Sequence, residues 1–211
     1  MRSNPRNHPR QARSKATVET ILQGAIRVLI KKGYEGTTTT AIAERAGVSV
    51  GSVYQYFPNK ESIVARLVER HAHDIVACIE AAAEQVADAR PEEALRAMIR
   101  AAIEAHRIHP ALHKVLSEQV PRVGRMKTAM DTSKRITAIV AAYLVRHRHL
   151  LGHRDPQRTA FVIETVVEAL THRAVIERPE ELDDGVIEAE AMELVMSYAF
   201  APQRPPRAPV R

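Results

Sequence analysis

Apolar residues in this chain recur at spacings of three and four, and no segment shows sustained two-residue alternation of β-branched residues. The first spacing is typical of one face of an α-helix, whereas alternation would indicate a half-buried strand. Glycine is scarce, with 8 residues in 211, and the alanine-rich stretches favour helix. The sequence therefore predicts an all-α fold of about nine helices.

The first helix is expected to begin near Ser14 and to end at Gly33. Two short helices follow over about 40–46 and 50–56, and Asn59 is a suitable N-cap for a long helix that ends near Asp88. Further amphipathic segments are predicted at about 91–107, 111–120, 124–149, 156–178 and 184–200. Both ends of the chain contain prolines and no apolar periodicity, which predicts a disordered basic arm over 1–13 and a disordered tail over 202–211.

Positive charge is concentrated near the N-terminus. Residues 1–60 contain ten Lys and Arg against three Asp and Glu, a balance of +7, whereas the rest of the chain has a balance of −1. Such an asymmetry is expected where one end of a chain meets a polyanion. A solubilising basic tail is the alternative explanation.

The stretch TTTTAIAERAGVSVGSVYQYFPNKE, from Thr37 to Glu61, has the spacing of a helix-turn-helix. Ala43 is small where a second helix would cross at close range, and Gly47 stands where the first short helix must end in a left-handed turn. Apolar residues at fixed offsets would hold the two short helices together: Ile42, Ala46, Val48 and Val53. A short helical hairpin with no DNA-binding role is the alternative.

The second short helix, 50–56, carries hydroxyl and amide groups and no acidic residue. A helix that enters a major groove needs groups that bond phosphates and base edges, and a carboxylate facing phosphate would be repelled. Lys60 adds a cation near the same surface. Tyr56 has an alternative position, packed inward against the core.

Between Ser14 and Leu67 the chain resembles the TetR family of bacterial transcriptional regulators. The residues that carry the resemblance are Gly33-Tyr34, the threonine-rich entry, Ile42-Ala43, Ala46-Gly47-Val48-Ser49, Gly51-Ser52-Val53-Tyr54, Tyr56-Phe57 and Asn59-Lys60-Glu61. The remainder of the chain matches the family only in length and helical character.

The resemblance implies a homodimer whose recognition helices enter successive major grooves of palindrome-like operator DNA, with 14–60 as the DNA-binding domain and 61–201 as the effector-binding and dimerisation domain. It implies DNA contacts from Thr38, Thr39, Thr40, Val50, Gly51, Ser52, Tyr54, Tyr56 and Lys60. Ser49 and Gln55 of the same segment are predicted to contact DNA as well. Val50 departs from the polar or basic residue that many members have there. An apolar side chain at this position would contact a thymine methyl and puts hydrogen-bonded readout in doubt.

Apolar residues in the segment 156–178 cover more than the single stripe that a surface helix needs, so this helix must be covered on two sides. The resemblance implies that it pairs with a second copy, together with the last helix, in a four-helix bundle. The dimer interface is therefore predicted at Phe161, Val162, Thr165, Val166, Ala169, Ile187, Ala191, Leu194, Val195 and Tyr198. A fully buried monomer core is the alternative.

The resemblance also implies a small-molecule pocket among the intermediate helices. Candidate lining residues are Met98, Ile103, His106, Leu112, Leu116, Met126, Met130 and Tyr143, although such a stripe is also typical of plain core. The chain has no Trp and only three Phe, so a pocket would rely on aliphatic and sulfur contacts, which is consistent with a lipophilic effector.

Other chemistry is poorly supported. The histidines of 106–113 and 147–153 lie around helix breaks, and a metal site is not predicted. Cys78 is expected to be a small core residue, no phosphate loop or nucleophile elbow is present, and neither a cofactor nor catalytic residues are predicted. No apolar run approaches a membrane span and no signal peptide is recognisable, so a cytoplasmic location is expected.

The sequence therefore predicts a sequence-specific DNA-binding regulator, more often a repressor in this family, that a small molecule releases from its operator. Two alternatives remain open. One is a small all-α enzyme or ligand-binding protein, and the other is a protein that coats nucleic acid without sequence preference.

Overall fold

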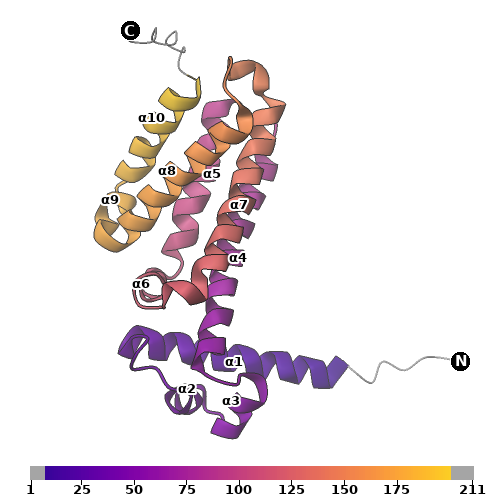
Figure 1. The fold of residues 1–211 in the computed structure, drawn as a ribbon, viewed down its shortest axis with the longest axis vertical. Helices are drawn as coiled ribbons and strands as arrows, with labels where there is room; N and C mark the ends of the chain where they lie inside the picture. The colour runs from indigo at the N-terminus through magenta and orange to yellow at the C-terminus, as the bar shows by residue number, and fades with distance from the viewer. Residues whose placement is uncertain (1–7, 201–211) are drawn as a thin grey trace, which may run out of the picture. The chain divides into compact units, whose positions relative to one another are not determined.

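The computed structural model describes residues 8–200, which form α-helices, one short 3-10 helix and no strand (Figure 1). The α-helices are α1 (His8–Lys32), α2 (Thr39–Ala46), α3 (Val50–Tyr56), α4 (Lys60–Gln85), α5 (Pro91–Arg107), α6 (Pro110–Glu118), α7 (Arg122–Arg146), α8 (Pro156–Glu177), α9 (Pro179–Asp183) and α10 (Val186–Phe200). The 3-10 helix, η1, covers Arg148–Leu150. The predicted all-α fold is confirmed, and the described residues hold ten α-helices where about nine were expected.

The chain divides into two compact units. Unit 1 contains the residues up to His71 and those from 111 to 128, and unit 2 contains 72–110 together with the residues from 129 onward. The division falls within α4 and α7, so each of these helices contributes to both units. The sequence had suggested a boundary near residue 60, and it did not anticipate that α6 would pack with the N-terminal helices.

Unit 1 is built around the packing of α1 on α2 and of α2 on α3. Its core holds Ile21 and Leu29 of α1, Ile42 of α2, Val53 of α3 and Ile63 of α4, none of which is exposed. Leu112 and Leu116 of α6 complete the same core. Val53 is therefore the residue that anchors the short helix α3, which has only seven residues and would not be stable alone.

Two glycines shape unit 1. Gly47 ends α2 with φ of +69°, and its N–H donates to the carbonyls of Ala43 and Glu44. This left-handed turn is the one predicted from the sequence. Gly24 was not predicted: a Cβ there would lie 2.9 Å from Cβ of Ala46, so α1 and α2 approach more closely than a larger side chain would allow.

Unit 2 packs α5, α8 and α10 against one another, and these three helices lie side by side in Figure 1. Its core contains Leu95 and Ile99 of α5, Leu144 of α7 and Val195 of α10. Pro91 begins α5 and Pro156 begins α8, as expected for proline in a first helical turn. Asp155 caps α8 by accepting a hydrogen bond from the backbone N–H of Arg158 at 2.8 Å.

The structure departs from the sequence-based expectations at two places. Residues 8–13 are helical, although a disordered arm was expected over 1–13, because Pro9 is tolerated within the first turn of α1, where no backbone N–H is needed. The five-residue helix α9 was not anticipated, since it is too short to show periodicity. The predicted disorder of residues 1–7 and 202–211 lies outside the described residues.

Candidate DNA interface and effector cavity

Helix α3 is held at its start by Ser49. The Ser49 side chain accepts a hydrogen bond from the backbone N–H of Ser52 at 3.0 Å, and the two hydroxyls lie 2.8 Å apart. Ser49 therefore satisfies one of the N–H groups that the first turn of a helix leaves unpaired. The cap, the turn at Gly47 and the buried Val53 together determine which side of α3 faces outward.

The outward side of α3 is uncharged. Val50, Gly51, Tyr54 and Gln55 are exposed, and Tyr54 retains 54% of its surface. The Tyr54 hydroxyl lies 3.2 Å from the Thr39 hydroxyl, which links α3 to the first turn of α2. This surface offers an amide, hydroxyls and a methyl-bearing side chain, which are the groups that read base edges and bond phosphates.

The start of α2 and the start of α4 flank this helix within unit 1. Thr38 caps α2 by accepting from the backbone N–H of Ala41 at 3.1 Å, and Thr40 is exposed in the same first turn. At α4, the Lys60 ammonium donates to the backbone carbonyl of Tyr34 at 3.1 Å and lies 4.5 Å from the centre of the Tyr34 ring. The Lys60 cation is thus held by a carbonyl and an aromatic face.

A basic groove runs between α1 and α2. Its lining includes the exposed cations Arg27, Lys31, Lys32 and Arg45 and one carboxylate, Glu44. The sequence reasoning did not single out these residues, although they account for four of the ten basic residues in the charged N-terminal segment. They provide a positive surface that is independent of α3.

Unit 2 encloses a cavity of about 50 Å³. Its walls are almost entirely aliphatic and come from four helices: Ile75 and Ile79 of α4, Leu95, Met98, Ile99, Ala102 and His106 of α5, Ile136 and Val140 of α7, and Ile163, Glu164, Val167, Glu168 and Thr171 of α8. Pockets that hold drug-sized ligands measure roughly 300–1,000 Å³. The cavity is therefore too small for such a molecule and would have to widen to admit one.

The lining residues that have polar side chains belong to α5 and α8. Glu164 is 6% exposed, and burial raises the pKa of its carboxyl, with the charge of Glu168 acting in the same direction and a hydrogen bond from Ser133 opposing it. The α8 residues Glu164, Val167, Glu168 and Thr171 share one helical face because they are three and four positions apart.

His106 is 6% exposed, and its Nδ1 lies 2.7 Å from the carbonyl of Ala102. Because a carbonyl only accepts, Nδ1 carries the hydrogen and the neutral ring presents a lone pair at Nε2. Burial lowers the pKa of His106, and the neighbouring His172 lowers it further, whereas the bond to Ala102 and the charge of Glu168 raise it. The neutral form is therefore favoured at neutral pH.

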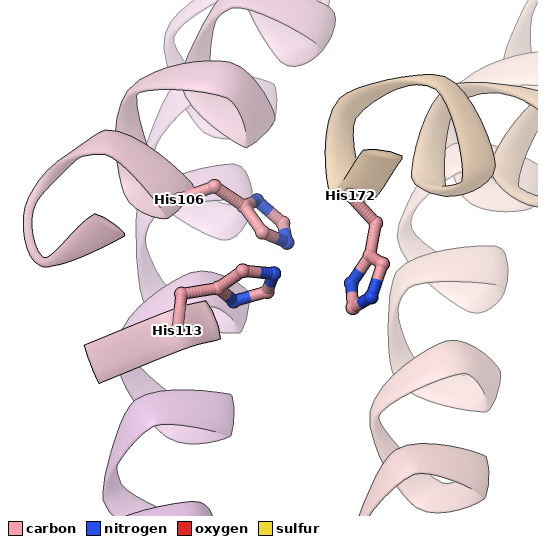
Figure 2. A group of neighbouring side chains, drawn as sticks. All are labelled: His106, His113 and His172. Atoms are coloured by element: carbon pink, nitrogen blue, oxygen red, sulfur yellow. The ribbon is translucent and has the colours of Figure 1, made fainter. Parts of the chain in front are cut away.

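His172 of α8 was not singled out from the sequence. Figure 2 shows the rings of His106 and His172 turned towards each other, and one ring nitrogen of each lies within 4.8 Å of the other. The third residue labelled in Figure 2, His113, belongs to unit 1, where its Nδ1 lies 3.0 Å from Nε2 of His71. Two imidazoles supply only half of a tetrahedral zinc site, so the expectation of no metal site stays a prediction.

Two sequence profiles match this chain. The family described as "Bacterial regulatory proteins, tetR family" matches residues 21–67, and the "Tetracyclin repressor-like, C-terminal domain" matches residues 90–198. The chain belongs to the TetR family. It is accordingly a helix-turn-helix transcriptional regulator, as the resemblance in the N-terminal segment implied.

Individual TetR-family proteins are similar over different lengths. The transcriptional regulator TtgR of Pseudomonas putida is 28% identical over 176 residues, which cover 77% of this chain and 81% of TtgR. An uncharacterised regulator of Bacillus subtilis, YvkB, is 43% identical over 56 residues, which cover 26% of this chain but only 30% of YvkB. The solved structure of the fatty acid degradation regulator FadR from Bacillus halodurans has a TM-score of 0.68 at 18% identity and covers 93% of this chain and 97% of FadR, which shows a shared fold.

The eleven residues predicted to contact DNA all lie in unit 1, and none is buried. Seven are exposed and four, Thr39, Ser52, Tyr56 and Lys60, are half-buried. Tyr56 packs partly against the core of unit 1, which was the alternative position considered for it. DNA contact by these residues stays a prediction.

The predicted pocket residues are scattered. Met98 and His106 line the cavity of unit 2, but Ile103 is buried elsewhere in that core. Leu112 and Leu116 belong to the core of unit 1, and Met126 and Met130 are exposed. Tyr143 instead donates from its hydroxyl to the carbonyl of Ala89 at 2.8 Å. The larger part of the cavity wall, including Glu164 and Thr171, was not predicted.

The predicted dimer residues fall into two groups. Ile187, Ala191 and Val195 of α10 are buried in the core of unit 2. The other seven, Phe161, Val162, Thr165, Val166, Ala169, Leu194 and Tyr198, are exposed or half-buried. Phe161 and Leu194 retain 57% and 50% of their surface, which is high for such large apolar side chains.

Every helix in the described part of the chain is too short or too polar to cross a lipid bilayer.

Proposed function

We propose that this TetR-family protein is a homodimeric repressor that binds palindrome-like operator DNA through α2 and α3. In this proposal a small molecule that occupies the cavity of unit 2 releases the protein from the operator. The observation that carries the DNA-binding part is the outward side of α3, which is exposed, uncharged and anchored by a single buried residue, Val53.

The geometry of α3 suits entry into a major groove. The helix has only seven residues, and its exposed residues present an amide, a phenol and an aliphatic side chain without any carboxylate. Gln55 is able to bond adenine, and Val50 is able to contact a thymine methyl. The Thr38 and Thr40 hydroxyls, at the first turn of α2, would donate to phosphates that flank the groove.

The proposed dimer uses the outer stripe of α8. Phe161, Thr165 and Ala169 are four residues apart and all exposed, and Val162 and Val166 lie half-buried beside them. A second copy that covered this stripe would remove Phe161 and Leu194 from water. A symmetric dimer reads symmetric DNA, which is why the operator is proposed to be palindrome-like.

The small volume of the cavity suggests how an effector would release the protein from its operator. A molecule larger than the present volume of about 50 Å³ binds only to a widened form of unit 2. The bound molecule therefore shifts the protein population towards the widened form. The size of this shift depends on how much more tightly the molecule binds the widened form than the small one. The similar proteins TtgR and FadR are described as regulators. That a small-molecule effector controls the present chain is our proposal.

A direct test compares duplexes that carry palindromes from the region upstream of the chain's own gene with scrambled duplexes of equal length. Fluorescence anisotropy at moderate salt should give a specific Kd at least about 10³ lower than that for scrambled DNA. A ratio near one would favour the alternative of a sequence-independent coating protein. Analytical ultracentrifugation at micromolar concentration should give a dimer, and a monomer would refute the proposed interface.

The alternative of an all-α enzyme has less support. The cavity is lined by aliphatic side chains, and its polar groups are two carboxylates, one imidazole and one hydroxyl. No nucleophile is paired with a base among these lining residues in a way that an acyl or phosphoryl transfer needs. Binding that leaves the small molecule chemically unchanged, measured by mass spectrometry, would support a regulator over an enzyme.

A further inference from the structure

The segment that joins α1 to α2 is held by the end of α6. The side-chain oxygen Oε1 of Gln119, the residue directly after α6, accepts a hydrogen bond from the backbone N–H of Tyr34 at 2.9 Å. The two residues are 85 positions apart in the sequence, and both belong to unit 1. This bond is therefore a tertiary contact between the helix-turn-helix segment and a helix that lies outside it.

The glycine before Tyr34 leaves room for this contact. Gly33 has φ of +69°, and a Cβ there would lie 2.5 Å from Oε1 of Gln119. A side chain at position 33 would displace the glutamine amide, so glycine permits a close approach here as well as the left-handed conformation. The backbone N–H of Gln119 donates to the carbonyl of Val115 at 3.0 Å, and Val115 is buried in the core of unit 1. The amide is thus presented by the end of an anchored helix.

Tyr34 contacts both flanks of the proposed DNA surface. Its carbonyl oxygen accepts from the Lys60 ammonium at 3.1 Å and from the backbone N–H of Thr37 at 3.2 Å. Its ring lies 4.5 Å from the same ammonium. Thr37 is completely buried and directly precedes Thr38, the N-cap of α2. The position of Tyr34 therefore determines where the Lys60 cation and the first turn of α2 lie.

We propose that Gln119 is a positioning residue for DNA binding, which holds Tyr34 where Lys60 and the start of α2 can meet the phosphate backbone. Gln119 itself does not touch DNA in this proposal. When the bond is lost, only the fraction of molecules that keep Tyr34 in place binds DNA well, and the measured Kd rises by the inverse of that fraction. The inference rests on the proposed DNA contacts of Lys60 and Thr38.

Gln119→Met keeps the length of the side chain and removes the amide oxygen. The net free energy of one hydrogen bond corresponds to a factor of about two to ten in an equilibrium, so the Kd for duplex DNA should rise by about three- to tenfold. Because the phosphate backbone is common to all duplexes, the probe is a fluorescent duplex of mixed sequence, and its binding is followed by anisotropy.

Two charged substitutions separate the hydrogen bond from general electrostatics. Gln119→Glu keeps an acceptor oxygen but adds a negative charge, whereas Gln119→Lys adds a positive charge and has no acceptor. General attraction to phosphate predicts that Gln119→Lys binds the duplex more tightly of the two. The proposal predicts the opposite order, with Gln119→Glu the tighter, at about 150 mM salt, where charges are screened over about 8 Å.

A double-mutant cycle tests the connection to Lys60. Residues that act independently raise the Kd by factors that multiply. Gln119→Met and Lys60→Ala together should raise the Kd by less than the product of their separate effects, because the Lys60 cation is part of what Gln119 positions. Gln119→Met should also lower the slope of log Kd against log salt by up to about one, the loss expected for a single phosphate contact. A bond that only stabilised the fold would leave this slope unchanged.

Gln23→Met is the matched control. Gln23 is an exposed glutamine of unit 1, and its amide donates to Glu19 in the same helix at 2.8 Å. This variant should bind the duplex as the wild type does, and circular dichroism should show wild-type helix content for both methionine substitutions. The inference would be overturned by an unchanged Kd in Gln119→Met, by tighter binding of Gln119→Lys than of Gln119→Glu, or by effects of Gln119→Met and Lys60→Ala that multiply.

Specific binding is measured separately on the palindromes from the upstream region. If Gln119→Met weakens binding to the mixed duplex and the wild type shows no preference for a palindrome, the positioning role stands and the proposed operator function fails. If the wild type prefers a palindrome and Gln119→Met binds both duplexes as tightly as the wild type, the operator function stands and the inference about Gln119 fails.

Discussion

Replacing Gly47 by alanine tests whether the turn between α2 and α3 is needed for DNA binding. Gly47 has φ of +69°, and a Cβ added there would meet no atom within 4 Å. The substitution therefore adds no steric clash with neighbouring side chains, and its effect is confined to the backbone. A residue with a Cβ in the left-handed region costs about 1–2 kcal/mol.

The free energy of unfolding of Gly47→Ala should therefore fall by about 1–2 kcal/mol, as measured by urea unfolding followed by circular dichroism. Operator affinity should fall as well, by up to about tenfold, because relief of the strain would tilt α3 away from its binding orientation and 1.4 kcal/mol corresponds to a factor of ten. Gly47→Asn should lose less on both measures, since asparagine tolerates this conformation better.

Gly152 offers a matched control in unit 2. It has φ of +60° and likewise no atom within 4 Å of an added Cβ, but it follows η1 and is not part of unit 1. Gly152→Ala should cost a similar amount of stability and leave operator affinity unchanged. The reasoning would be refuted if Gly47→Ala lost no stability, or if Gly152→Ala weakened operator binding as much as Gly47→Ala.

Three further substitutions probe charge and assembly. Lys60→Ala should weaken binding to all duplexes alike and lower the slope of log Kd against log salt by about one, as anisotropy titrations would show; a change in sequence preference with an unchanged slope would contradict a phosphate contact. Glu164→Gln should raise the melting temperature at neutral pH. The raised pKa of Glu164 means that its contribution to stability is present below pH 4.5 and is lost as pH rises through the folded-state pKa, so the gain should grow over that interval; melting curves parallel to the wild type from pH 4 to 8 would contradict it. Leu194→Glu, at a side chain that is 50% exposed, should convert the dimer to a monomer in sedimentation without unfolding it; an unchanged dimer would place the interface elsewhere.

Local chemistry explains which elements were predictable. The bounds of α3 and α5 agree with those expected from the sequence, because Ser49 caps the first and Pro91 begins the second. These signals act within one helical turn. The helix α1 begins six residues before the predicted start, because residues 8–13 lack apolar periodicity but a first helical turn accommodates Pro9.

The cavity shows why the candidate site was harder to predict. Met98 and His106 lie on the inward face of α5, and the spacing of apolar residues in the sequence is enough to identify that face. Which helices face that side depends on the tertiary fold, and no pattern within α8 indicates that Glu164 or Thr171 would lie there. Leu112 and Leu116 have the same periodicity as true lining residues, but they pack into the core of unit 1. The residues of the proposed DNA surface lie within one continuous segment, so they could be proposed from the sequence without knowledge of the tertiary fold.

Helix α4 connects the two proposed sites within a single element. Lys60 stands at its first residue, beside the proposed DNA surface, and Ile75 and Ile79 line the cavity of unit 2. A ligand that widens the cavity must displace at least one of its four walls, and α4 is the wall that also bears Lys60. The coupling free energy is then limited by the difference in ligand affinity between the small and the widened forms of the cavity, so effectors should release the operator in the order of their preference for the widened form.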